Sequence, residues 1–97
     1  MAQIIIGVAP VDIRPRNAGR KTITLRNIST GGQIIYFWLQ SAQGLAIANA
    51  DYALAINEEK SFIEYFDGKD IKNPIAAIAS AAGGLLLYGE TMEYVKG

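Results

Sequence analysis

Carboxylates are the side chains of this sequence that come closest to a catalytic or metal-binding pattern. Asp67 and Asp70 flank Gly68 and resemble part of a calcium loop, which needs a Glu at its twelfth position. Counted from Asp67, the twelfth residue is Ile78, so the calcium pattern fails. A solvated turn is the better interpretation, because Asp and Gly are typical turn residues.

Two other pairs of acids, Glu58-Glu59 and Glu90 with Glu93, offer the two carboxylates that glycoside hydrolysis requires. The first pair falls in a predicted turn, and the sequence identifies no cleft for either. The chain contains no His and no Cys, so the commonest general base, a thiol nucleophile and Cys-ligated zinc are excluded. We therefore predict that the protein is not an enzyme and uses no cofactor.

Phosphate and nucleic-acid binding are the next chemistries to consider. Gly31-Gly32 and Gly83-Gly84 belong to no phosphate-binding motif. Five basic residues lie near the N-terminus: Arg14, Arg16, Arg20, Lys21 and Arg26. They could contact nucleic acid while Tyr36 and Trp38 stack on bases. Nucleic-acid-binding domains are usually basic overall, whereas nine acids balance nine bases here, so the sequence argues against this function.

Charge is unevenly distributed along the chain although its sum is zero. Residues 1–26 hold five bases and one acid, a net charge of +4, and residues 51–97 hold four bases and eight acids, a net charge of −4. Residues 27–50 and 73–89 carry no charge. A positive part and a negative part would suit contacts between copies of the chain.

The size of the chain bounds how much of it can be buried. Its 97 residues are enough for one domain, 1–97, and 51% of them are apolar, which excludes a disordered chain. A domain this small buries only ~60–65% of the surface of its unfolded chain. Two long uncharged stretches therefore leave a neutral, apolar face outside, and such faces mark contacts with other proteins. The alternative is that neutral polar residues simply cover that surface.

Short runs rich in Ile, Val, Thr and aromatic residues, separated by Gly, Pro, Asn and Asp, are typical of strands. We expect strands at residues 3–8, 21–28, 33–40, 52–56, 60–66, 75–80 and 85–95. Turns recur about every ten residues, which predicts an all-β fold: a single-domain antiparallel β-sandwich of about seven or eight short strands. Residues 9–19 contain Pro10, Pro15 and Gly19 and are expected to form an extended arm or loop.

Two segments deserve separate interpretation. Residues 33–40 are apolar on both faces, which predicts a central strand with one side in the core and the other covered by a loop or a neighbour. Residues 75–82 are rich in Ala, the best helix former. The run is short and lacks a polar face, so a strand ending in a hairpin at Gly83-Gly84 is preferred. Gly89 is expected to mark a bulge in the last strand.

No export or membrane signal is evident. The N-terminal residues have no basic start, and the longest apolar stretch, residues 75–88, is shorter than the ~20 residues of a spanning helix. We expect a soluble protein that is made in the cytoplasm and does not bind membranes.

Two segments resemble a known family. NAGRKTITLRN, residues 17–27, resembles the N-x-x-R-K-x-[IL]-x-[IL]-x-N stretch of small all-β structural proteins of tailed bacteriophages. NPIAAIA, residues 73–79, with Gly83-Gly84 and Glu90 after it, resembles their second signature, G-x-I-[YA]-A-I-A, which ends in a Gly-rich hairpin. The chain departs from the pattern at Asn57-Glu58, where the family has Pro-Gly, and at Asn73-Pro74, where a Gly is expected.

The resemblance implies a virion component made in the host cytoplasm: a head decoration (cement) protein, a capsid fibre base or a tail-associated module. It implies the major capsid protein or other virion proteins as partners, and a trimer as the homo-oligomer. The alternative is a tail- or fibre-associated module that binds a host-surface glycan through exposed Tyr or Trp, helped by Asp67, Asp70 or Asn73.

Aromatic residues and Arg are where the energy of protein interfaces concentrates. The interface candidates are therefore Tyr36, Phe37, Trp38, Arg14, Arg16 and Arg20. Phe37 faces away from Tyr36 and Trp38 on a strand, so only one of the two sets can point outward. Arg20 could bind a carboxylate with a two-pronged contact or be an ordinary edge-strand charge. Asn17 and Asn27 are expected to cap the backbone at turns.

Overall fold

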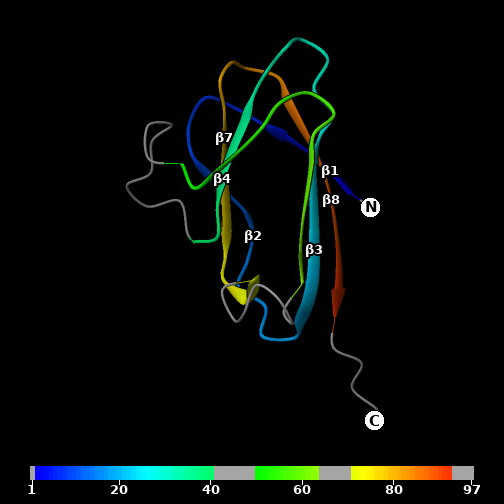
Figure 1. The fold of residues 1–97 in the computed structure, drawn as a ribbon. Helices are drawn as coiled ribbons and strands as arrows, with labels where there is room; N and C mark the ends of the chain where they lie inside the picture. The colour runs from blue at the N-terminus through cyan, green and yellow to red at the C-terminus, as the bar shows by residue number, and fades with distance from the viewer. Residues whose placement is uncertain (1, 41–49, 64–70, 93–97) are drawn as a thin grey trace.

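The computed structural model describes residues 2–40, 50–63 and 71–92, which form eight strands (Figure 1). The strands are β1 (Ala2–Ile6), β2 (Val11–Arg14), β3 (Arg20–Asn27), β4 (Ile35–Trp38), β5 (Tyr52–Leu54), β6 (Glu59–Ile63), β7 (Ile75–Ala79) and β8 (Gly84–Met92). They pair into two four-stranded antiparallel sheets, ordered β1-β8-β3-β6 (sheet A) and β2-β7-β4-β5 (sheet B). The predicted all-β sandwich is confirmed.

The chain alternates between the two sheets. Among the described strands, only β4 and β5 are consecutive strands of one sheet, and each of the other connections leads from one sheet to the other. The hairpin predicted at Gly83-Gly84 is therefore wrong: β7 lies in sheet B and β8 in sheet A, and the connection is a corner between layers. The turn at residues 29–32 likewise joins sheet A to sheet B. Gly32 and Gly83 have φ angles of 82° and 83°, which an L side chain rarely adopts.

The core lies between the sheets. Ile23 and Leu25 of β3 meet Ile35 and Phe37 of β4, and all four side chains are fully buried. Every residue of β7 is buried, because this strand is central in sheet B and both of its faces are covered. The strand interpretation of this Ala-rich run is confirmed over the helical one. β4 is central as predicted, since it pairs with β5 on one side and β7 on the other.

Gly84 is required where β1, β7 and β8 converge. A Cβ placed there would lie 2.8 Å from the Cβ of Ala79 and 3.0 Å from the carbonyl oxygen of Ile6. Real Cβ atoms essentially never lie as close as 2.8 Å to another atom, and 3.0 Å is tighter than most, so glycine lets the start of β8 lie this close to Ala79 and Ile6.

Two local predictions are corrected. Val11–Arg14, expected within an arm or loop, is the edge strand β2, which pairs with β7 with a register shift between Asp12 and Arg14. Gly89 marks no bulge: it pairs in register with Thr24, and the irregularity in this pair of strands lies between Arg20 and Thr22. The solvated turn expected at Asp67 and Asp70 falls outside the described residues.

Two asparagines cap turns as predicted. Asn17 Oδ1 accepts the Gly19 N–H at 2.9 Å, and Asn27 Oδ1 accepts the Ser29 N–H at 3.0 Å. Asn27 does more, because its Nδ2 donates to the carbonyls of Gln33 and Leu54, both at 2.8 Å. Asn27 ends β3 in sheet A and Leu54 ends β5 in sheet B, so one buried amide joins the two layers.

Replacing this amide tests its role. Asn27→Ala removes both donors and leaves the buried Leu54 carbonyl and the part-buried Gln33 carbonyl short of a partner, so we expect the free energy of unfolding to fall by about 2–4 kcal/mol. Asn17→Ala is the matched control, because its Oδ1 serves one part-buried turn, and it should cost less than about 1 kcal/mol. Urea unfolding followed by circular dichroism measures both. Equal losses would contradict a special role for Asn27.

Candidate interaction surface

The structure places the six interface candidates in different environments. Phe37 and Trp38 are both fully buried although they point to opposite sides of β4. Trp38 packs with Ala76 and Ile78 on the outer face of sheet B, and this small cluster is covered within the chain. Phe37 thus points into the core and Tyr36 and Trp38 point to the outer face of sheet B, as expected of alternating residues, but only Tyr36 of the three is partly accessible.

Phe37 belongs to an aromatic cluster that fills the core. Its ring stacks on that of Tyr52 with a centroid distance of 4.9 Å and an interplanar angle of 16°. Phe62 of β6 meets both rings edge-on, at 6.0 Å from Phe37 and 5.1 Å from Tyr52. These geometries are the favourable ones for aromatic pairs. The cluster holds sheet A against sheet B and is not available to a partner.

Arg20 is also fully buried, which is unusual for an arginine. Its Nε donates to Glu90 Oε2 at 2.5 Å. Its Nη1 donates to the carbonyls of Ile71 and Asn73 at 2.8 and 2.9 Å, and its Nη2 donates to Pro15 O at 2.9 Å. The carboxylate contact is therefore made through one nitrogen, and the remaining donors hold two loops against the end of the sandwich.

Glu90 is shared between two arginines. Arg14 Nε lies 2.5 Å from Glu90 Oε1, although its approach falls outside hydrogen-bonding geometry, so this contact is an ion pair alone. The Arg14 guanidinium carbon also lies 5.1 Å from the centre of the Tyr88 ring, within reach of a cation–π contact. Arg14 comes from sheet B, whereas Arg20 and Glu90 come from sheet A. We call Arg14, Glu90 and Arg20 the ion clamp.

The ion clamp changes the interpretation of the charge pattern. Arg14 and Arg20 belong to the positive N-terminal part and Glu90 to the negative C-terminal part. These charges meet inside one chain, so they are not available for contacts between copies. Arg16, which lies between β2 and β3, is exposed and remains a candidate for a polar rim.

The outer face of sheet A is the large uncovered face of the sandwich. Alternation along each strand places on it the side chains opposite the core residues Ile6, Ile23, Phe62 and Leu86. We call this set the neutral face: Gln3, Ile5, Thr22, Thr24, Arg26, Glu59, Ser61, Ile63, Leu85, Leu87, Gly89 and Thr91.

Hydroxyl pairs and aliphatic side chains make up the neutral face. Thr22 Oγ1 lies 2.5 Å from Thr91 Oγ1, and Thr24 Oγ1 lies 2.9 Å from Ser61 Oγ, so these hydroxyls satisfy one another across strands. Ile5 is 74% exposed and Ile63 is 42% exposed. The two charged members, Arg26 and Glu59, face each other in register at one corner. The face as a whole carries no net charge.

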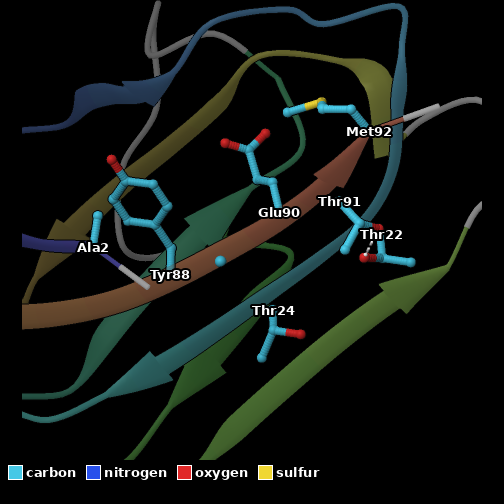
Figure 2. A pocket seen from close by; sticks show the side chains of 8 residues that line it. Ala2, Thr22, Thr24, Tyr88, Glu90, Thr91 and Met92 are labelled. Carbon is cyan, nitrogen blue, oxygen red and sulfur yellow. Dashed lines mark hydrogen bonds between the residues drawn. The ribbon is translucent and has the colours of Figure 1, made fainter. Parts of the chain in front are cut away.

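A shallow pocket of about 590 Å³ lies along the C-terminal half of β8, between Ala2 and Met92. Figure 2 shows Tyr88, Glu90 and Met92 on one side of β8, and the Thr22–Thr91 pair and Thr24 of the neutral face nearby. The only acid in the lining, Glu90, is already bound by two arginines. The pocket presents hydroxyls, a ring and a thioether, but no nucleophile with a free base beside it.

Other chemical candidates from the sequence gain no support as sites. Glu58 Oε1 accepts the Ala55 N–H at 2.7 Å, which makes Glu58 a turn residue. Glu93, Asp67 and Asp70 fall outside the described residues. Within residues 2–40, 50–63 and 71–92, no three acidic, His or Cys side chains gather into a group that could hold a metal ion. Nor does any helix of this part have the length and apolar character to cross a membrane.

Comparisons of the chain with protein-family models, curated proteins and solved structures found no match.

Sequence reasoning missed Glu90 as the partner of Arg20, because residues 70 positions apart carry no local signal of contact. The sequence does contain a signal for the neutral face, because Thr22, Thr24 and Arg26 alternate with Ile23 and Leu25 along one predicted strand. That pattern marks a face turned away from the core, and its breadth across four strands appears only once the register is known.

The ion clamp makes a direct prediction. Glu90→Gln leaves the buried Arg20 guanidinium without a counter-charge, so we expect the free energy of unfolding to fall by about 3–5 kcal/mol. Glu59→Gln, an exposed substitution of the same kind, should change it by less than about 0.5 kcal/mol. Thermal and urea denaturation measure both variants. A Glu90→Gln variant whose free energy of unfolding equals that of the parent chain would show that the ion clamp contributes little to stability.

Proposed function

We propose that this chain is a non-enzymatic structural protein of a tailed-bacteriophage virion, most specifically a head decoration (cement) protein. In this proposal it binds the lattice of the major capsid protein through the neutral face of sheet A. It is made in the host cytoplasm and resides in the virion.

The exposed neutral face is the observation that carries the proposal. The water-exposed face of an antiparallel sheet is normally polar and carries charged side chains. This face instead carries Thr, Ser, Gln, Ile and Leu, with a single opposed Arg26–Glu59 pair. Ile5 and Ile63, on the two edge strands of sheet A, keep much of their apolar surface in water. Burying such a face gains roughly 25 cal/mol per Å² of apolar surface without desolvating isolated charges.

The proposed action is mechanical. A decoration protein that spans the joint between neighbouring capsid subunits must be detached before those subunits can separate. About 800 Å² buried on each partner is enough for specific docking. A domain held by an inter-sheet ion clamp and a stacked aromatic core would transmit force with little deformation, because packed interiors resist compression.

The resemblance of residues 17–27 and 73–79 to phage structural proteins supports the same proposal, and the structure explains those residues physically. Asn17 and Asn27 cap turns, Arg20 forms the clamp, and residues 75–79 are the fully buried β7. Binding of a glycan by exposed aromatics has weaker support. Trp38 is buried, and Asn73 Nδ2 is bound to the Leu39 carbonyl at 3.2 Å.

A charge placed in the centre of the neutral face tests the proposal. Thr24→Arg would have to be buried without a partner on docking, so we expect binding to empty heads of the phage that encodes the chain to weaken by ~10-fold or more. Thr30→Arg, an exposed substitution of the same kind in the β3–β4 connection, should bind like the parent chain. Co-sedimentation with heads measures binding, and thermal denaturation checks that both variants fold.

Two results would contradict the proposal. One is that the parent chain fails to bind heads and is instead stabilised by glycans on a glycan panel. The other is that both arginine variants bind heads as well as the parent chain, which would exclude the neutral face as the docking surface.

A further inference from the structure

Strand β1 forms an open edge of sheet A. Among the described strands it pairs only with β8, in an unbroken register from Ala2–Tyr88 to Ile6–Gly84. Its sequence, AQIII, contains no charge and no proline. Alternate residues of an antiparallel strand direct their N–H and C=O groups to each side, so the side away from β8 presents a row of unpaired backbone groups.

The other three edge strands carry features that discourage pairing with another chain. β2 has a register shift, charged Asp12 and Arg14, and prolines at positions 10 and 15. β6 begins with Glu59 and Lys60, both exposed. β5 is only three residues long. Charges, prolines, bulges and short length are the usual protections of a sheet edge, and β1 has none of them.

The uncharged character of β1 suits a second copy of itself. Two copies related by a two-fold axis perpendicular to the sheet place their β1 strands antiparallel, with the neutral faces on the same side. Such pairing sets Ile5, which is 74% exposed, against the β1 strand of the other copy. No like charges meet, because neither strand carries a charge, and the open backbone groups of both strands are satisfied together.

We propose that two copies of this chain associate through β1, which joins their A sheets into one eight-stranded antiparallel sheet. The neutral faces of the two copies become continuous, so the dimer offers twice the docking surface of one chain. This inference goes beyond the proposed function by naming an edge through which the chain associates with itself. It predicts a dimer, whereas the family resemblance implies a trimer.

The association is tested on the isolated chain, without phage heads. Sedimentation equilibrium over ~1 µM to ~1 mM should show a monomer–dimer equilibrium, because a strand-edge contact is smaller than a standard interface and therefore of modest affinity. Ile5→Lys places two like charges at the joint and should raise the dissociation constant by ~10-fold or more. Gln3→Lys, also exposed on β1, is the second variant and should act in the same direction.

Ile63→Lys is the matched control. It makes the same substitution at an exposed Ile of the same face, but on β6, the opposite edge of sheet A. Its dissociation constant should stay within about 2-fold of the parent value, because Ile63 lies at the edge of sheet A farthest from the β1 joint. Thermal denaturation at low concentration confirms that each variant folds.

Three results would overturn the inference. A chain that is monomeric up to ~1 mM does not use the β1 edge. A trimer excludes two-fold pairing. A dimer that Ile63→Lys weakens as much as Ile5→Lys associates by its face rather than by its edge. Because none of these measurements involves heads, the inference can fail while head binding stands, and head binding can fail while the β1 dimer stands.

Discussion

The ion clamp at one end of the sandwich is the interaction on which the arrangement of the two sheets most depends. Glu90 of β8 meets Arg20 within sheet A and Arg14 across the core, and Arg20 also binds three loop carbonyls. Transferring a guanidinium from water to a buried site is costly, and it is tolerated here because the Glu90 carboxylate and three carbonyls accept hydrogen bonds from four of its five N–H donors. At the other end of β3, Asn27 joins the layers with neutral hydrogen bonds. β3 is therefore held at its start to the loops next to β2 and β7 and at its end to β5, and the aromatic cluster fills the space between the sheets.

This rigid frame separates two faces with different properties. On sheet B, Trp38, Ala76 and Ile78 are buried within the chain. On sheet A, Ile5 and Ile63 remain in water among paired hydroxyls. The neutral face thus lies on the opposite sheet from the aromatic run, residues 36–38 of β4. Of the two uncharged stretches, only Leu85, Leu87 and Gly89 belong to the neutral face, whereas β4 and β7 of these stretches are largely buried in sheet B.

The sequence was enough to predict local features whose cause is local. Alternation of Ile23 and Leu25 with threonines predicted β3, the apolar run within residues 33–40 predicted a central strand, and Asn27 was predicted as a cap. Features set by partners distant in the chain were missed. Gly83 and Gly84 allow a sharp change of direction, but they do not specify whether the next strand pairs with the previous one or crosses to the other sheet. The arginine at position 20 gave no indication that its acid lies at position 90, and burial of both Phe37 and Trp38 depends on packing against both sides of sheet B.

The central claim is that the neutral face of sheet A is in contact with the capsid lattice in the particle. Electron cryomicroscopy of the intact phage at a resolution that shows strands tests it most directly. The account predicts a β-sandwich of this topology on the head, with Thr24 and its neighbours on sheet A against the major capsid protein. A particle whose head lacks this sandwich, or carries it with the outer face of sheet A turned to solvent, would contradict the account.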